Sequence, residues 1–199
     1  MPPRHVYGWA NRFDDIERQF RSLYCSAQRL TCLREVLADF RLNTKAIAEF
    51  RELFGESAQL PRGKVPLAFR ARTVLAGATI HLRDGNLVDI DSVVVRAGLE
   101  ERLARLLADY GMDHLNIGEI RSEDRAVTQT IARVLYDDGA AGIIFKSKLD
   151  DEPCAALFER RAYLASNGVF EPLSGAFPDL LQVCAEYGLV LAPAAEHHS

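Results

Sequence analysis

Apolar residues recur at helical spacing in five segments of the chain. In the clearest segment, 94–110, they return every three or four positions, and Gly111 follows where a helix would end. In another, Ser122 is a suitable N-cap and Gly139 suits the position just after the last turn. The five predicted helices span 27–41, 44–53, 94–110, 122–139 and 178–188.

Shorter apolar runs predict strands between these helices. GIIFKS at 142–147 reads as a buried strand, and AALFERR at 155–161 is predicted to be its neighbour. The other strand-like stretches are 21–26, 68–75, 78–82, 86–90 and 189–192. The turn-rich segment 54–66 predicts a loop. Because helices and strands are mixed without strict alternation, we expect one α+β domain over 1–199, with a mixed sheet and helices on its faces.

Charge and hydropathy narrow the class of protein. The 199 residues carry a formal net charge of −4 and their basic residues are spread out, which argues against nucleic acid as the main partner. No apolar run approaches the length of a membrane-spanning helix, and the first residues, MPPRHVYGW, lack the apolar stretch of a signal peptide. We therefore expect a cytoplasmic protein with neither nucleic acid nor a membrane as its partner.

Several common motifs of nucleotide and metal chemistry are missing. The sequence has no GxGxxG, GxxxxGK[ST], HExxH or GxSxG, so a Rossmann site, a P-loop, a zinc protease and an α/β-hydrolase are not predicted. The four cysteines form no CxxC pair and have no histidine at zinc-ligand spacing. We predict no metal site and interpret the cysteines as reduced thiols packed in a core.

Four polar residues have both an ordinary and a functional interpretation. Glu35 falls opposite the apolar stripe of its predicted helix, which is typical of a solvated face. Arg12 suits the surface, Tyr24 a core and Ser147 a strand end. In one cleft, however, an arginine could grip phosphate, a tyrosine offer its ring, a carboxylate stabilise positive charge and a serine donate a hydrogen bond. Such a set could act on a sugar phosphate, although spacing alone does not show that the four converge.

Two blocks of the chain resemble the RES-domain family, which is named for its arginine, glutamate and serine. NRFDDIERQFRSLYCSAQRLTCLREVLADFR at 11–41 is similar to the family's Arg-Phe pair, Leu-Tyr strand and glutamate-bearing helix. DRAVTQTIARVLYDDGAAGIIFKSKLDDEPCAALFERR at 124–161 is similar to its Thr-Gln helix, its Gly-Ile-aromatic-x-Ser strand and the strand after it. The resemblance runs from about 9 to 192 and is strongest over 9–41 and 113–161.

The resemblance implies an ADP-ribosyltransferase-like fold and NAD+ as the substrate, with no further cofactor. Many relatives are toxins of bacterial toxin–antitoxin pairs that consume NAD+ by hydrolysis or phosphorolysis. By position, the family's arginine, tyrosine, glutamate and serine match Arg12, Tyr24, Glu35 and Ser147. The partners that we consider are therefore NAD+, phosphate as a co-substrate, a cognate antitoxin protein and a second copy of the chain.

In the mechanism that the resemblance implies, the bond between nicotinamide and ribose breaks and the ribose becomes oxocarbenium-like. Arg12 would hold the diphosphate, and Glu35 would stabilise the positive charge. Tyr24 would pack against nicotinamide or its ribose, and Ser147 would form a hydrogen bond nearby. Gln129 is interpreted either as a secondary polar contact or as part of a helix surface.

One departure from the family pattern supports an alternative. Family members usually carry another arginine on an N-terminal strand well before the Arg-Phe pair, whereas only 11 residues precede Arg12 here. The alternative is a non-catalytic RES-like module that binds NAD+ or a protein without cleavage. A third reading, ADP-ribosylation of a protein, keeps the same site and changes the acceptor.

Overall fold

The computed structural model of the protein describes residues 8–121 and 125–193. The chain divides into two compact units, each built from two stretches of sequence. Unit 1 comprises Met1–Ala27 and Ala78–Ala165, and unit 2 comprises Gln28–Gly77 and Ser166–Ser199. Two interleaved units can belong to one domain, so the single domain over 1–199 stays a prediction.

Unit 1 is built on a four-stranded mixed sheet. In spatial order its strands are β1 (Ser22–Ser26), β6 (Pro153–Phe158), β5 (Gly142–Lys146) and β4 (Leu87–Asp89). β6 is antiparallel to β1 and to β5, whereas β4 is parallel to β5. This arrangement confirms the predicted mixed sheet of an α+β fold. It also confirms that the GIIFKS strand and the strand after it are neighbours.

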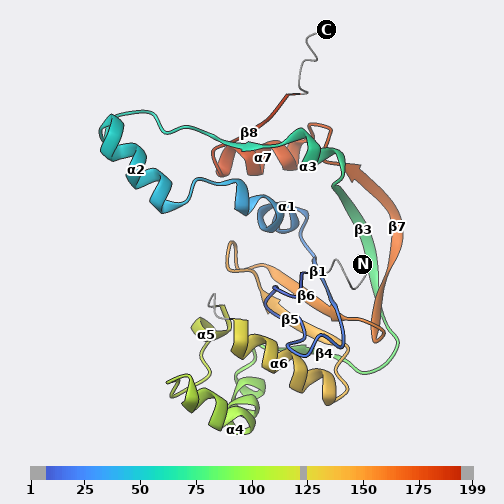
Figure 1. The fold of residues 1–199 in the computed structure, drawn as a ribbon. Helices are drawn as coiled ribbons and strands as arrows, with labels where there is room; N and C mark the ends of the chain where they lie inside the picture. The colour runs from blue at the N-terminus through green and yellow to red at the C-terminus, as the bar shows by residue number, and fades with distance from the viewer. Residues whose placement is uncertain (1–7, 122–124, 194–199) are drawn as a thin grey trace. The chain divides into compact units, whose positions relative to one another are not determined.

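Helices cover one face of this sheet. The helices of the described part of unit 1 are α4 (Val93–Asp109), α5 (Ile117–Arg121) and α6 (Arg125–Asp137). α6 packs against β5 and α4 packs against α6 (Figure 1). Leu103 of α4, Ile131 of α6 and Ile143 of β5 belong to one buried cluster, as the helical periodicity predicts. The predicted N-cap Ser122 lies outside the described residues.

A smaller buried cluster lies on the opposite face of the sheet. Ala155 and Leu157 of β6 lie in a second buried cluster, whereas Ala156 between them lies in the cluster with the helices. β6 is therefore buried on both faces, which explains its continuous apolar sequence. Two further strands, β3 (Val74–Leu82) and β7 (Ala162–Pro172), pair in a separate two-stranded sheet, and each runs through parts of both units.

Unit 2 is mainly helical. Its elements are α1 (Arg29–Leu37), the 3₁₀ turn η2 (Ala38–Phe40), α2 (Thr44–Phe54), α3 (Leu67–Ala71), α7 (Pro178–Glu186) and the short parallel strands β2 (Gly63–Val65) and β8 (Leu189–Leu191). α1 packs against α7, and Leu33, Leu37 and Leu180 share a buried cluster. Among the helices that the structure describes, none has both the length and the apolar character to cross a membrane.

The strand predicted over 68–75 is wrong in its first half, which forms α3. Phe69 packs against the cluster of unit 2. Arg70 is buried and donates hydrogen bonds to the carbonyl oxygens of Ser174 (3.3 Å) and Ala192 (2.5 Å). These partners are more than 100 residues away in sequence. Tertiary contacts therefore decide the conformation here, and local apolar pattern does not.

Candidate functional site

The segment that carries Arg12 has no regular secondary structure, yet apolar side chains anchor it in unit 1. Phe13 and Phe20 are fully buried. The Phe13 ring lies 4.9 Å from that of Phe145 on β5, and the Phe20 ring stacks on Tyr136 of α6 at 4.0 Å between centroids. Arg12 thus lies in a segment that the sheet and α6 both hold.

Two buried carboxylates organise the backbone of the same segment. Asp14 accepts hydrogen bonds from the backbone N–H (2.8 Å) and the side-chain amide (3.1 Å) of Asn11. Asp15 accepts one from the backbone N–H of Gln19 (2.5 Å). Short Asp side chains often satisfy nearby backbone groups in this way outside helices and sheets. The turn that contains Arg12 and the turn that follows it are therefore closed by side chains of the segment itself.

Strand β1 holds both backbone groups of Phe13. The Ser22 hydroxyl donates to the carbonyl oxygen of Phe13 (2.6 Å), and the N–H of Phe13 donates to the Tyr24 hydroxyl oxygen (2.7 Å). Ser22 and Tyr24 are two positions apart and so point to the same face of the strand. The Tyr24 ring also meets Phe145 edge-on at 6.3 Å. Tyr24 therefore holds Phe13, the residue next to Arg12, and its ring lies beside Phe145, which also contacts the Phe13 ring.

Helix α6 holds the segment from another side. The Gln129 side-chain amide donates to the carbonyl oxygens of Asn11 (3.0 Å) and Trp9 (3.4 Å). One turn further, Arg133 approaches the buried carboxylate of Asp15 (3.5 Å). Residues four apart share one face of a helix, so both contacts come from the same side of α6. Gln129 thus contacts the backbone of the Arg12 segment, and its predicted role as a secondary polar contact in the site stays a prediction.

The Arg12 guanidinium lies over the ring of Phe145, 5.9 Å from its centroid. A guanidinium that lies over a ring makes its hydrogen bonds to an anion in its own plane. A half-buried arginine on an aromatic surface can therefore still grip a phosphate with a planar fork. Sequence reasoning missed Phe145 in this role. The available signal was its position two residues before Ser147 on a strand, which gives the two side chains the same face.

Ser147 follows β5 directly and is fully buried. Its hydroxyl oxygen accepts a hydrogen bond from the N–H of Leu149 (3.0 Å), and its own N–H donates to the carbonyl of Glu152 (2.9 Å). Lys146 and Lys148 are exposed, as the alternation of a strand predicts. Ser147 thus closes the turn between β5 and β6, two residues after Phe145, whose ring lies under the Arg12 guanidinium.

Glu35 lies on the exposed side of α1, opposite the buried Leu33 and Leu37. Two arginine pairs fix this helix on α7: Arg34 with Glu186 (3.0 Å) and Arg29 with Asp179 (2.7 Å). Glu35 is thus presented on a firmly placed helix. It belongs to unit 2, whereas Arg12, Tyr24 and Ser147 belong to unit 1, so the convergence of all four stays a prediction.

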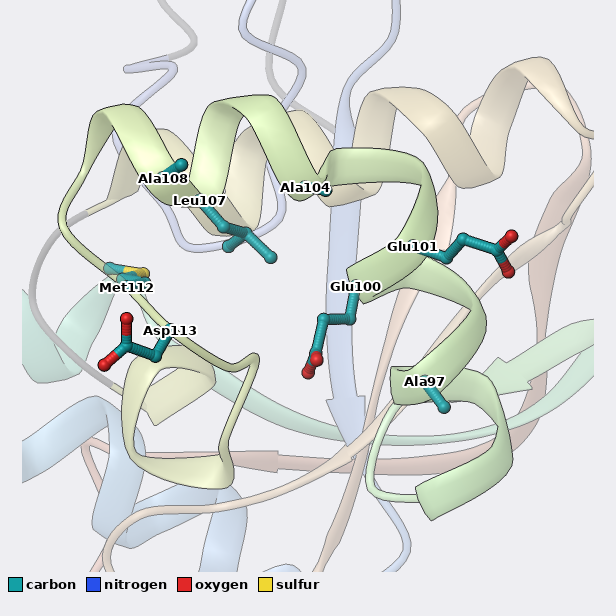
Figure 2. Close-up of a pocket in the computed structure, with 8 residues that line it drawn as sticks. All are labelled: Ala97, Glu100, Glu101, Ala104, Leu107, Ala108, Met112 and Asp113. Atoms are coloured by element: carbon teal, nitrogen blue, oxygen red, sulfur yellow. The ribbon is translucent and has the colours of Figure 1, made fainter.

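A surface hollow of about 440 Å³ lies along α4 and the segment after it (Figure 2). All its ionisable lining residues are acidic, namely Glu100, Glu101 and Asp113. Hydrogen bonds from His114 (3.0 Å) and the N–H of Leu115 (2.9 Å) lower the pKa of Glu100 and keep it charged at neutral pH. This hollow would repel a diphosphate, and none of the four predicted site residues lines it.

In the described part of the chain, the cysteines form no disulfide and no side chains are grouped as a metal site. All four cysteines lie in the described part of the chain and none forms a disulfide. Cys154 and Cys184 are buried, whereas Cys25 and Cys32 are half-buried, and burial raises the pKa of the Cys184 thiol. Within 8–121 and 125–193, no three His, Cys, Asp or Glu side chains are grouped to hold a metal ion.

Comparison with known proteins gives one family. The model of the RES domain matches residues 1–172, a range that includes Arg12, Tyr24, Glu35 and Ser147. No curated protein and no solved structure matches the chain.

Proposed function

Because the chain belongs to the RES domain family, we propose that it is an NAD+-consuming enzyme that cleaves the bond between nicotinamide and ribose. The family is associated with NAD-related, toxin-like enzymes. The proposal includes an ADP-ribosyltransferase-like fold, a cytoplasmic location and a cognate antitoxin as partner. Its main structural support is the placement of Arg12 on Phe145, in a segment that β1, β5 and α6 all hold.

Arg12 suits the diphosphate of NAD+ for a physical reason. The hydrogen bonds that a guanidinium donates to phosphate oxygens are charge-assisted, and two of them can form side by side in a bidentate pair. The backbone around it is fixed before the ligand arrives, so that little ordering is needed on binding. In the proposed site Arg12 binds the diphosphate, Tyr24 holds the Arg12 segment and offers its ring to nicotinamide or its ribose, and Ser147 shapes the end of β5.

Glu35 is the residue proposed to act on the reacting carbon. When the bond from ribose C1′ to nicotinamide nitrogen breaks, the electron pair leaves with neutral nicotinamide and positive charge develops on the ribose. A carboxylate placed near that charge stabilises the transition state. A new bond then forms from C1′ to an oxygen of water or of inorganic phosphate. The water proton is released to solvent, and the product is ADP-ribose or ADP-ribose with a phosphate on that same carbon.

The experiment follows NAD+ loss and product mass with the purified full chain, with and without phosphate. We expect wild-type protein to consume NAD+ and Glu35→Gln to lose activity by on the order of 100-fold or more, as when a group that stabilises transition-state charge is removed. Glu101→Gln, which changes another glutamate on an exposed helix face, is the matched control and should keep full activity. Turnover by Glu35→Gln equal to wild type would overturn the assignment of this residue.

The burial of Ser147 favours a second candidate, a non-catalytic RES-like module. Its hydroxyl is fully buried and accepts a hydrogen bond from Leu149, so it is placed for structure more than for contact with a ligand. Calorimetric titration with NAD+ separates the two candidates. Binding without any loss of NAD+ would support the module. NAD+-dependent labelling of a protein would instead support ADP-ribosyl transfer.

A further inference from the structure

A surface hollow of about 380 Å³ lies wholly within unit 1, beside the turn that joins β6 to β7. Its apolar lining consists of Leu23, Ala162 and Leu164, which all belong to or pack against the smaller buried cluster of the sheet. Leu23 and Tyr24 are neighbours on β1 and therefore point to opposite faces of that strand. The hollow thus lies on the face of the sheet away from Tyr24, and it is separate from the candidate site around Arg12.

Two arginines at this hollow have no acidic partner in the described part of the chain. Arg83 and Arg160 line it and are exposed, and neither forms an ion pair with a carboxylate of residues 8–121 or 125–193. Glu159 also lines the hollow, but its carboxylate accepts hydrogen bonds from the side chain (2.5 Å) and the backbone N–H (3.2 Å) of Arg21. Because Arg21 neutralises Glu159, the two arginines leave the hollow positively charged.

The backbone places both arginines at the same turn. The N–H of Arg83 donates to the carbonyl oxygen of Arg161 (2.8 Å), which ties the end of β3 to the turn between β6 and β7 (Figure 1). Arg160 lies in that turn with a φ of +73°, a conformation that suits glycine and costs energy for any residue with a side chain. The two guanidinium groups are therefore carried by one hydrogen-bonded piece of backbone.

An aromatic ring orients one of the two arginines. The Arg83 guanidinium lies over the ring of Tyr163, 5.0 Å from its centroid, and His81 stacks on the same ring at 5.1 Å. A guanidinium in this position makes hydrogen bonds to an anion in its own plane. Tyr163 itself lines the hollow and is 44% exposed. Arg83 is thus held against a ring beside the hollow and can still donate to an anionic ligand.

The composition of this surface favours a protein as its ligand. Tyrosine and arginine are among the residues that contribute most to binding at protein interfaces. Water and salt screen exposed arginines, so a small free anion would bind weakly without further contacts. Nucleic acid or an anionic membrane would extend beyond the hollow and meet a chain whose net charge is −4. A short acidic segment avoids this repulsion because it covers only the basic hollow.

We propose that this hollow binds an acidic segment of a partner protein. One Asp or Glu carboxylate of the segment pairs with Arg83 and another with Arg160, while an apolar side chain between them packs on Leu23 and Leu164. The charges are complementary, and the apolar lining adds contacts that a free anion lacks. Since the hollow is small and its arginines are exposed, the binding is expected to be weak and to depend on salt. This inference does not rest on the proposed NAD+ activity.

The test is an NMR titration of the isotope-labelled full chain with the peptide acetyl-Glu-Asp-Leu-Asp-Glu-amide. We expect the Nε–H signals of Arg83 and Arg160 and the amide signal of Tyr163 to shift as the peptide binds. The dissociation constant should rise about fivefold or more when the salt concentration is raised from about 50 to about 500 mM. A peptide with Gln and Asn in place of its acidic residues should bind much more weakly.

Two variants remove one positive charge each from the hollow. Arg83→Gln and Arg160→Gly should each weaken peptide binding about fivefold or more. Glycine suits the positive φ of residue 160, so Arg160→Gly should not lower the thermal unfolding midpoint and its lost binding cannot be attributed to unfolding. Arg105→Gln is the matched control, because it removes an exposed arginine of α4 that does not line the hollow, and it should keep wild-type binding.

Three results would overturn the proposal. The first is the absence of shifts at Arg83, Arg160 and Tyr163 up to about 10 mM peptide, a limit set by the weakness of exposed ion pairs. The second is an equal loss of binding in Arg105→Gln, which would indicate attraction to net charge alone. The third is tighter binding at these residues by inorganic phosphate, a short DNA duplex or phosphatidylglycerol vesicles, which would assign the hollow to another class of ligand.

Discussion

Residues 11–20 contain no helix or strand, whereas α2 is helical over 11 residues, and yet only the first of these segments contains buried side chains. The Arg12 segment is held by Phe13 and Phe20 in the core and by bonds from Ser22, Tyr24 and Gln129. α2 is held by its own caps and backbone bonds. The first segment has a fixed place without a regular conformation, and the second has a regular conformation without a buried face.

The difference teaches where positional order comes from in this protein. Backbone hydrogen bonds within a short helix fix its shape but not its attachment to a core, because most helical stability in proteins comes from packing of an apolar face. Burial and non-local hydrogen bonds fix a segment whatever its backbone shape. A ligand-binding side chain such as that of Arg12 is therefore better positioned by a buried segment with non-local hydrogen bonds than by an unpacked helix.

The largest expected effect compares one phenylalanine from each segment. Phe13→Ala removes a fully buried ring and should lower the free energy of unfolding by about 3–5 kcal/mol. Phe54→Ala removes a ring that is 64% exposed and should change it by less than about 0.5 kcal/mol in dilute, monomeric protein. Urea denaturation followed by fluorescence measures both. Equal losses would mean that α2 is packed as firmly as the Arg12 segment.

A smaller effect is expected from the Tyr24 hydroxyl. Tyr24→Phe keeps the ring against Phe145 but leaves the N–H of Phe13 without this acceptor, which should cost about 1–3 kcal/mol. Hydrogen exchange at the Phe13 amide should become faster in the same variant. Tyr163→Phe, at a tyrosine that is 44% exposed, is the control and should change neither quantity. An unchanged exchange rate at Phe13 would show that the bond does not hold the segment.

The smallest of the three effects concerns Gln129. Gln129→Ala keeps a good helix former on α6 and removes the donor to Asn11 and Trp9, so stability should fall by about 1 kcal/mol. If the segment positions Arg12, the KM for NAD+ should rise more than kcat falls. Gln182→Ala removes an amide that donates to Glu186 on the same helix (2.8 Å) and serves as the control. The same KM change in both variants would argue against a positioning role for Gln129.

Sequence reasoning succeeded where a pattern is local. The leucines at 99, 103 and 107 repeat at helical spacing and are buried on α4. The run GIIF that begins β5 is apolar on both faces of the strand, and the strand ends at the exposed Lys146. It failed over 67–71, where Arg70 is drawn into unit 2 by distant carbonyl groups, and it gave no strand over Ala162–Pro172. β7 is mostly exposed and contains an Asn-Gly pair, so no alternation marks it.

The site shows the same limit. Family resemblance supplied Arg12, Tyr24, Glu35 and Ser147 as candidates, but no periodicity relates the Tyr24 hydroxyl to an amide 11 residues earlier. The contact between Gln129 and Trp9 spans 120 residues and depends on how α6 docks on the sheet. Such geometry arises only from the packed fold, which is why the residues could be named from sequence and their joint arrangement could not.

The large sequence separation between Gln129 and Trp9 also determines when their contact can form during protein synthesis. Trp9 and Gln129 are 120 residues apart, and Ser22 pairs with Phe158 across the β1–β6 ladder. At about 5–20 residues per second, a ribosome needs on the order of 6–24 s to make the intervening chain. Until α6 and β6 have been made, β1 lacks its partner strand and the Arg12 segment lacks its contacts with α6. Under the proposed function, a growing chain thus reaches a competent arrangement only after α6 and β6 have been made, which would protect the cell from NAD+ consumption by unfinished copies.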